Sequence, residues 1–190
     1  MSRKFIPTWL SLMKSSSGLA EVMSQGRLVI GVDPGLAVTG YGVVHENPQG
    51  DLSWVDHGVI KTASTQPDPE RLYALFKELK GVVERHRPDT CAVEKLYMQR
   101  NVKTAIRVGQ GRGAALIALA DARMPLSEYT PNEIKQAVVG YGNADKNQVQ
   151  QMVKLLLGMG EIPQPDDAAD ALAVAICHLH STRQQRMIEA

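Results

Sequence analysis

Apolar residues alternate with small or polar ones at the start of the predicted fold, in RLVIGVDPGLAVTGYGVV, which spans Arg27–Val44. This period of two predicts a β-strand that ends at Asp33. The Asp33 side chain continues the row begun by Val29 and Gly31, so it projects beside apolar neighbours. A carboxylate in such a place needs a hydrogen-bonding partner, a proton or a metal ion. Asp33 can also simply open the turn that follows, where aspartate is common.

Two more strands are predicted directly after the first. A Pro-Gly pair turns the chain after Asp33, and Thr39–Val44 predicts a strand that runs back beside the first. Gly40 and Gly42 in that strand leave room for another backbone to approach closely. Leu52–Lys61 is rich in β-forming residues and predicts the third strand. We therefore expect the first three strands to pair antiparallel.

Helix and strand patterns alternate after this unit. Apolar residues at helical spacing over Glu70–Arg87 predict an amphipathic helix that covers one face of the sheet and ends at Pro88. The short apolar run DTCAVE predicts a buried strand that closes on Glu94. Because a helix leads into it, we expect it to lie parallel to one of the first three strands. Asn101–Ala122 is rich in alanine and predicts a second long helix, and PLSEY predicts a fifth strand.

The last third of the chain predicts three helices. A capping box formed by Thr130 and Glu133 begins the first of them. The second covers about Asp145–Leu157, and the third begins at Asp166 or Asp167. Three strands followed by helices that alternate with short strands indicate an α/β fold with a mixed sheet.

Three acidic residues stand out because their surroundings are apolar: Asp33, Glu94 and Asp170. Asp33 and Glu94 end two strands, while Asp167 and Asp170 share one face of the final helix in its first turns. If the two strands are parallel neighbours, their carboxylates meet at the edge where open α/β sheets place their sites. Such a cluster repels itself unless hard divalent cations neutralise it. Two such ions about 4 Å apart would suit in-line phosphodiester hydrolysis.

Each acidic residue also has a structural alternative. Asp167 can favour the helix N-terminus by its charge alone, and Asp166 is more simply explained as the helix cap. Glu94 can form a buried ion pair with an arginine. His178 lies on the same side of the final helix as Asp167 but ~16 Å further along, so it cannot share the same metal ion. His180 is expected at the surface.

Composition adds three points. With 190 residues, 44% of them hydrophobic, the chain can bury one full core. Cys91 and Cys177 lie far apart in apolar segments, which favours packing roles and a reducing cytoplasm. The formal net charge of +1 does not indicate a nucleic-acid-binding protein, but Lys95–Arg112 contains five basic residues and no acidic one. Such a run can contact phosphates or merely form a solvated helix face.

Three segments are expected along the chain. Residues 1–26 predict a flexible extension, because their short apolar piece is broken by Pro7 and Lys14 and makes a poor secretory signal. Residues 27–182 predict the folded domain, and residues 183–190 a C-terminal tail. The sequence contains no uninterrupted apolar run of the length that a membrane span requires, so no membrane association is expected.

Five blocks, in order and at matching spacing, make residues 27–180 resemble a known family. They are IGVDPGLAVTGYGVV, AVEKLYMQRN, VGQGRGAALIA, IKQAVVGYGNADKNQVQQMV and DAADALAVAICH. Together they resemble the RuvC Holliday junction resolvases. The resemblance implies an RNase H-like fold, a five-stranded mixed sheet flanked by helices. It also implies an endonuclease that cuts four-way DNA junctions by paired symmetric nicks in recombination and repair. This enzyme would be a homodimer in the bacterial cytoplasm, with the RuvA–RuvB branch-migration complex as its partner.

The resemblance assigns metal ligands and catalytic lysines. It implies that four acidic residues hold two Mg²⁺ per active site, with Mn²⁺ as a substitute. It also implies that two lysines take part in catalysis and in DNA binding. The acidic residues are Asp33, Glu94, Asp167 and Asp170, and the lysines are Lys135 and Lys146.

Further DNA contacts are expected after Glu94. Tyr97 falls where relatives present an aromatic side chain to junction bases, although it can equally be an ordinary semi-buried tyrosine. Three basic residues at helical spacing can track phosphates: Arg100, Lys103 and Arg107. Lys95 departs from the family, whose members often carry glutamine there, and its effect on the neighbouring glutamate stays open.

Two other classes of function remain as alternatives. A non-catalytic junction-binding protein of the same fold is the first, although loss of a carboxylate would be its first sign and all four are present. An ATPase or kinase of the actin and sugar-kinase type is the second, since it also uses an Asp-x-Gly strand turn. That class needs two such halves around a nucleotide, and no second phosphate loop is evident in the 190 residues.

Overall fold

A mixed five-stranded sheet forms the centre of the molecule. A computed structural model describes residues 26–95 and 102–189. The strand order is β3-β2-β1-β4-β5. β1, β2 and β3 pair antiparallel, as the sequence predicts. β4 was expected to be parallel to one of these three strands, and it lies parallel to β1, while β5 lies parallel to β4. The strands are β1 (Arg27–Asp33), β2 (Val38–Glu46), β3 (Leu52–Lys61), β4 (Thr90–Glu94) and β5 (Leu126–Tyr129).

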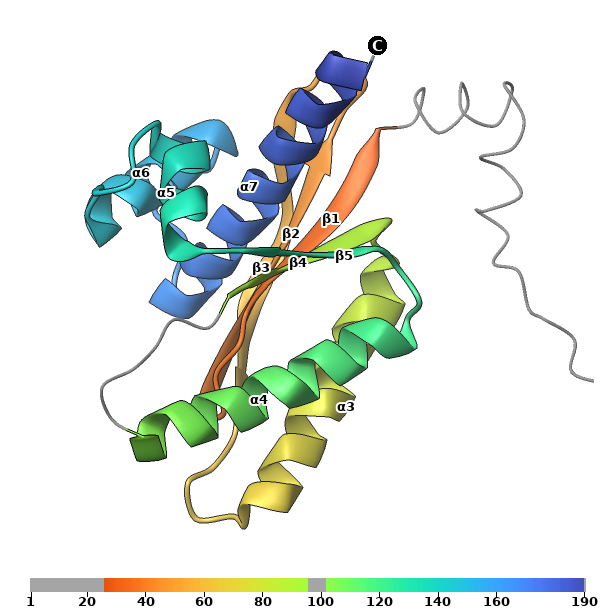
Figure 1. The fold of residues 1–190 in the computed structure, drawn as a ribbon, viewed down its shortest axis with the longest axis vertical. Helices are drawn as coiled ribbons and strands as arrows, with labels where there is room; N and C mark the ends of the chain where they lie inside the picture. Colours follow the sequence, from red (N-terminus) through yellow and green to blue (C-terminus); the bar gives the residue numbers. More distant parts are fainter. Residues whose placement is uncertain (1–25, 96–101, 190) are drawn as a thin grey trace, which may run out of the picture.

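Helices cover both faces of this sheet (Figure 1). One face carries α3 and α4, and the other carries α7, with α5 and α6 packed against α7. The helix starts agree with the predictions to within two residues, and the capping boxes that precede α5 and α6 are both formed. The helices are α3 (Asp68–His86), α4 (Val102–Asp121), α5 (Pro131–Val139), α6 (Lys146–Leu156) and α7 (Asp166–Glu189).

Glycines in β1 and β2 let α7 lie directly on the sheet. A Cβ atom at Gly31 would clash with the carbonyl oxygen of Ala171, and one at Gly40 would clash with that of Asp167. A Cβ at Gly42 would lie 2.7 Å from the Leu172 side chain. The close approach expected at Gly40 and Gly42 is therefore confirmed, and the approaching backbone is that of α7.

Apolar side chains fill the two layers on either side of the sheet. The stretch Ala171–Cys177 of α7 is completely buried, as its lack of polar residues predicts. On the other face, Leu75 and Leu79 of α3 and Leu119 of α4 pack against buried side chains of the sheet. No helix in the described part of the chain is long and apolar enough to cross a bilayer.

The C-terminal end differs from the expectation. Residues 183–189, expected as a tail, are helical and form the last turns of α7. No glycine or proline follows residue 182 to end the helix, and its arginines contact the β2–β3 region. Arg183 donates to the carbonyl oxygen of Gly50 at 3.2 Å, and Arg186 lies 3.4 Å from the Glu46 carboxylate. The predicted extension, residues 1–26, lies outside the described residues except for Gly26.

Candidate active site

Two strand-end carboxylates meet at one edge of the sheet. Val32 of β1 lies opposite Val93 of β4 in the parallel pair, so the next residues, Asp33 and Glu94, leave the two strands side by side. A hydrogen bond joins the two carboxyl groups, and it requires a proton on one of them. The parallel pairing expected from the sequence is confirmed.

The first turns of α7 bring two further carboxylates to this edge. Asp33 is paired across the sheet with Gly40, and the backbone of Asp167 lies directly over Gly40. The negative charges of Asp170 and Asp167 both act on the Asp33 carboxyl. Four carboxylates from three distant segments thus lie at one edge of the sheet. The start of α7 can approach this edge closely because Gly40 of β2 has no side chain.

Burial and neighbouring negative charges raise the pKa of three of these carboxyl groups. Burial, followed by the charges of Glu94 and Asp170, raises the pKa of Asp33 to about 8. Burial also raises the pKa of Glu94 and that of Asp170. In the absence of a cation, the Asp33–Glu94 pair therefore holds a proton at neutral pH, and the site favours any cation that replaces it.

Two lysines face this acidic edge. Lys146, the first residue of α6, places its Nζ 3.0 Å from Oδ2 of Asp170, and this contact opposes the rise in the pKa of Asp170. The charge of Lys135 on α5 lowers the pKa of Glu94. Both lysines predicted at the site therefore lie within electrostatic reach of its carboxylates.

Arg112 of α4 is a residue of this site that was not expected from the sequence. Its guanidinium donates to the carbonyl oxygen of Glu94 and to the Glu128 carboxylate, and its charge lowers the pKa of Glu94. In the sequence, Arg112 was considered only as one of the five basic residues of Lys95–Arg112. Arg112 lies three residues before the buried Ala115 and seven before the buried Leu119, so it is on the inner face of α4. This spacing could have indicated from the sequence that Arg112 faces the sheet.

Asp166 also takes part in polar contacts at the site. From the sequence, this residue is expected to be a helix cap. In the structure its Oδ2 lies 3.2 Å from Nζ of Lys146, and its Oδ1 accepts a hydrogen bond of 3.0 Å from Gln150. These two contacts, the one from Gln150 first, lower the pKa of Asp166.

The two histidines of α7 lie away from the acidic edge. His178 is buried, with Nδ1 2.9 Å from the Tyr129 hydroxyl and Nε2 3.0 Å from that of Thr90. Burial lowers its pKa to about 4, so it is a neutral core residue. His180, expected at the surface, is partly buried because its Nδ1 contacts the carbonyl oxygen of Ala137 at 2.9 Å.

The predicted DNA contacts are only partly within the described residues. Tyr97 and Arg100 lie outside them, and so does the side chain of Lys103. Arg107 is exposed on α4, and its Nε lies 3.8 Å from the Asp68 carboxylate. It lines an open cavity of about 650 Å³ beside the turn between β1 and β2, together with Leu36.

The donor set at the acidic edge fits a hard divalent cation, since it consists of carboxylate oxygens. Within residues 26–95 and 102–189, however, no three His, Cys, Asp or Glu side chains are arranged to hold one ion together. The Lys146 ammonium lies 3.0 Å from Asp170, and burial raises the pKa of Asp33 to about 8. The oxygen donors of the site therefore suit a hard cation, and in this arrangement Lys146 supplies a positive charge beside Asp170.

The sheet order, its antiparallel first three strands and its flanking helices define an α/β protein of the RNase H-like class. Residues 29–178 match the family model described as Crossover junction endodeoxyribonuclease RuvC. The chain belongs to the RuvC family.

Relatives of known name match most of the chain. A crossover junction endodeoxyribonuclease RuvC from Chloroflexus aurantiacus is 54% identical over 152 residues, which are 80% of this chain and 92% of that protein. The protein of the same name from Alkaliphilus oremlandii is 50% identical over 81% of this chain and 93% of its own length. The alignments therefore cover nearly the whole of these relatives.

Solved structures agree with this assignment. The T. thermophilus RuvC in complex with Holliday junction substrate superposes with a TM-score of 0.80 at 36% identity, covering 84% of this chain and 96% of that one. The yeast mitochondrial Holliday junction resolvase Ydc2 has a TM-score of 0.64 at 16% identity, over 90% of this chain and 89% of that one. The latter likeness concerns the fold alone.

Proposed function

We propose that this chain is a metal-dependent endodeoxyribonuclease that resolves four-way DNA junctions by paired symmetric nicks, in recombination and repair. The observation that carries the proposal is the convergence of four carboxylates and two lysines at one sheet edge. Membership of the RuvC family supports the same reaction. A site of this composition suits a phosphodiester, whose negative charge both the lysines and bound cations would neutralise.

Mg²⁺ is the proposed cofactor, at two ions per active site, with Mn²⁺ as a substitute. The proposed ligands are Asp33, Glu94, Asp167 and Asp170. When bound, such ions would activate a water molecule and stabilise the leaving oxygen of the cleaved bond. The raised pKa of Asp33, caused first by burial and then by its acidic neighbours, supports this assignment, because a bound cation would remove that repulsion.

The residues of the chain have separate tasks in this proposal. Asp33 gives up its carboxyl proton to solvent when the site is loaded. Lys146 leaves Asp170, which becomes available as a ligand, and its ammonium then binds a phosphate oxygen. Lys135 neutralises phosphate charge from the α5 side. Arg112 holds the end of β4 by donating to the Glu94 carbonyl oxygen, which keeps the glutamate at the edge.

A homodimer is the proposed assembly, with α4 at its interface. Ile106 and Ile117 of α4 are 56% and 62% exposed, and they lie three helical turns apart on one side of the helix. Between them, a Cβ atom added at Gly109 or Gly113 would meet nothing within 4 Å. An exposed apolar and small face of this kind suits close packing against the same face of a second copy.

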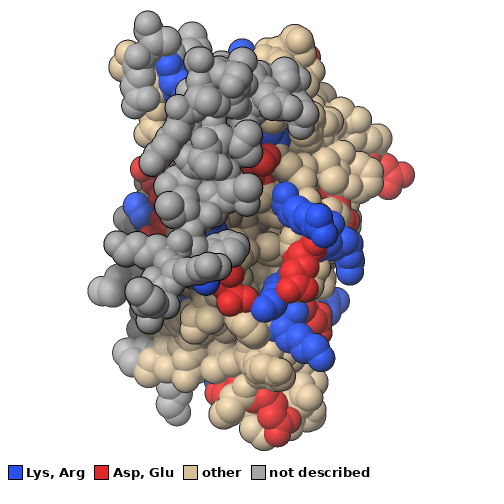
Figure 2. Space-filling view, turned by 90° about the vertical axis from the view of Figure 1, so that its right-hand side faces the viewer, with Lys and Arg blue, Asp and Glu red and all other residues tan. Residues whose placement is uncertain are grey.

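Two active sites related by a two-fold axis would address the two strands of a symmetric junction. Base and phosphate contacts are proposed for Lys103 and Arg107 of α4, and for Tyr97 and Arg100, which lie outside the described residues. The RuvA–RuvB complex is the proposed partner and the bacterial cytoplasm the proposed location. In the described residues, acidic and basic side chains adjoin on one face of the molecule (Figure 2). DNA contact is therefore proposed at the active-site edge rather than over a uniformly basic surface.

Cleavage of a synthetic mobile four-way junction in Mg²⁺ tests the proposed function. Linear duplex and single strands of the same sequence serve as substrate controls, and Asp33→Asn as the protein control. We expect symmetric paired nicks confined to the junction. Tight junction binding without nicks in either Mg²⁺ or Mn²⁺ would contradict the proposal and favour a non-catalytic junction-binding protein.

A further inference from the structure

Lys146 lies between two carboxylates of the same helix. Its Nζ is 3.0 Å from Oδ2 of Asp170 and 3.2 Å from Oδ2 of Asp166. The two aspartates are four residues apart on α7, so both project from one side of its first turns. Only Asp170 belongs to the four carboxylates proposed as metal ligands. Asp166 is therefore a second carboxylate partner for the lysine, outside that set.

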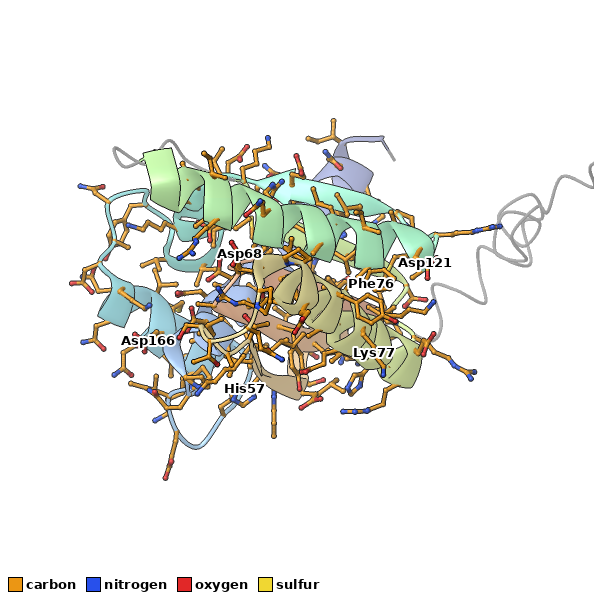
Figure 3. All side chains as sticks on the ribbon, turned by 90° about the horizontal axis from the view of Figure 1, so that it is seen from below. His57, Asp68, Phe76, Lys77, Asp121 and Asp166 are labelled. Carbon is orange, nitrogen blue, oxygen red and sulfur yellow. The ribbon has the colours of Figure 1, made fainter. Side chains whose placement is uncertain are left out.

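Asp166 is itself held in place from α6. The side-chain amide of Gln150 donates to Oδ1 of Asp166 at 3.0 Å, and Gln150 is only 8% exposed. Lys146 and Gln150 are also four residues apart, so α6 presents an ammonium and an amide side by side to the start of α7. Figure 3 shows Asp166 there, apart from Phe76 and Asp121 of the α3–α4 layer.

We propose that Asp166 is a positioning residue that keeps Lys146 beside the active site when a divalent cation takes Asp170. This inference rests on the proposed metal-dependent function. A cation on Asp170 repels the ammonium and competes for the same carboxylate. Lys146 is half exposed, and without another partner its long side chain would move into solvent and lose its order. With Asp166 it keeps one charge-assisted hydrogen bond within the same turn of α7.

Two measurable effects follow from this arrangement. Asp166 lowers the cost of displacing Lys146 from Asp170, so its loss weakens binding of the cation. It also keeps the ammonium near the phosphate, so its loss slows cutting even when the metal is saturating. Because both partners are partly exposed, each effect is expected to be about two- to fivefold.

A double-mutant cycle on the full chain tests the coupling between the two residues. The variants are Asp166→Asn, Lys146→Met and the double substitution, and the readout is Mn²⁺ affinity, measured without DNA by electron paramagnetic resonance of the free ion. Asp166→Asn keeps an oxygen that accepts from Gln150 and removes only the charge. The matched control is Glu161→Gln, which removes one exposed carboxylate from the loop before α7.

We expect Asp166→Asn to weaken Mn²⁺ binding by about two- to fivefold when Lys146 is present and by clearly less in the Lys146→Met background. Glu161→Gln should show no such coupling. In single-turnover cutting with saturating Mg²⁺, Asp166→Asn should lower the rate constant and leave the junction dissociation constant unchanged.

Equal effects of Asp166→Asn in both backgrounds would overturn the positioning role, since they would reflect only the long-range charge of the aspartate. No effect in either background would overturn it as well. These outcomes differ from failure of the proposed function itself, in which the unsubstituted protein would bind no Mn²⁺ and cut no junction.

Discussion

The two faces of the sheet are covered in different ways. On one face α7 rests on Gly31, Gly40 and Gly42, so its backbone touches that of the strands. On the other face α3 and α4 rest on the strands through bulky apolar side chains such as Ile30 and Val32, and α4 approaches backbone at Gly111, against the turn between β1 and β2. Contact through side chains tolerates small shifts, because side chains repack, whereas backbone contact fixes the helix position. The proposed catalytic carboxylates lie on the side where backbone contact fixes the helix.

Ion pairs on the two sides differ in the surroundings of their carboxylates. Lys146 and Asp170 pair at 3.0 Å beside a buried, repelling group of carboxyls. Lys80 and Asp121 pair at 2.7 Å across α3 and α4, where both side chains are exposed. An exposed pair contributes little to stability, because solvent screens it. Similar ion pairs thus have different roles on the two faces of the sheet. Substitutions on each face can distinguish these roles.

Asp33→Asn is expected to have the largest effect. It removes a proposed metal ligand and should reduce junction cutting by on the order of 10³-fold or more, while junction binding stays largely in place. The measurement is single-turnover cutting in Mg²⁺ beside a binding titration in the absence of a divalent ion. Cutting at the normal rate would remove Asp33 from the active site.

Gly40→Ala should reduce both activity and stability. The new methyl would clash with the Asp167 carbonyl oxygen and move the start of α7 away from Asp33. We expect a loss of about 1–3 kcal/mol in the free energy of unfolding and at least a tenfold slower cut. Chemical denaturation and single-turnover cutting measure the two effects.

The matched control for Gly40 lies on the opposite face. A Cβ at Gly81 of α3 would meet nothing within 4 Å. Gly81→Ala should therefore stabilise the protein by about 0.5–1 kcal/mol through helix propensity and leave cutting unchanged. If the two alanine variants behaved alike, the contrast between backbone contact and side-chain contact would fail.

Lys135→Ala should slow cutting by about 10- to 100-fold, since it removes a positive charge proposed to neutralise phosphate. Lys80→Ala on the other face is the control. It should leave both the stability and the cutting rate nearly unaltered, because solvent screens the exposed ion pairs of Lys80. Single-turnover rates at saturating protein compare the two variants. Unaltered kinetics for Lys135→Ala would count against its assigned role.

The metal-free protein should lose stability as the pH rises from about 6.5 to about 8, because below about 6.5 the lowered pKa of the buried His178 has the opposite effect on stability. The pKa of Asp33 in the folded state is raised to about 8 by burial and by neighbouring carboxylates, from an unfolded value of 3.8. Between these values the folded state binds the proton more tightly, so folding is favoured at the lower pH. Thermal melts in a chelator measure this effect.

The same melts should show a smaller pH dependence for Asp33→Asn, with a higher melting temperature than the unsubstituted protein at pH 8. The expected rise is about 2–4 °C for each kcal/mol of repulsion removed. Addition of Mg²⁺ should likewise reduce the dependence in the unsubstituted protein. A pH profile identical in the variant would show that the Asp33–Glu94 pair is not its source.

Much of the fold was determined by local sequence patterns. The alternation that ends at Asp33, the capping box at Thr130 and the apolar run Ala171–Cys177 each depend on neighbours within a few residues. The helical crossover predicted that β4 is parallel to one of the first three strands, and the structure shows that this strand is β1. These patterns, together with the predicted ends of the two strands, were enough to expect Asp33 and Glu94 at one edge of the sheet if the strands are neighbours.

Contacts between distant segments were decided only by the tertiary structure. Arg112 reaches Glu94 and Glu128 across two elements, and Asp166 meets Lys146 from another helix. α7 continues through residues 183–189, whose arginines contact Gly50 and Glu46. The hydrophobic periodicity of the sequence does not predict such partners, because they depend on how whole helices and strands pack together. The sequence by itself therefore determined the elements and the acidic residues at their ends, whereas packing decided which charges meet there.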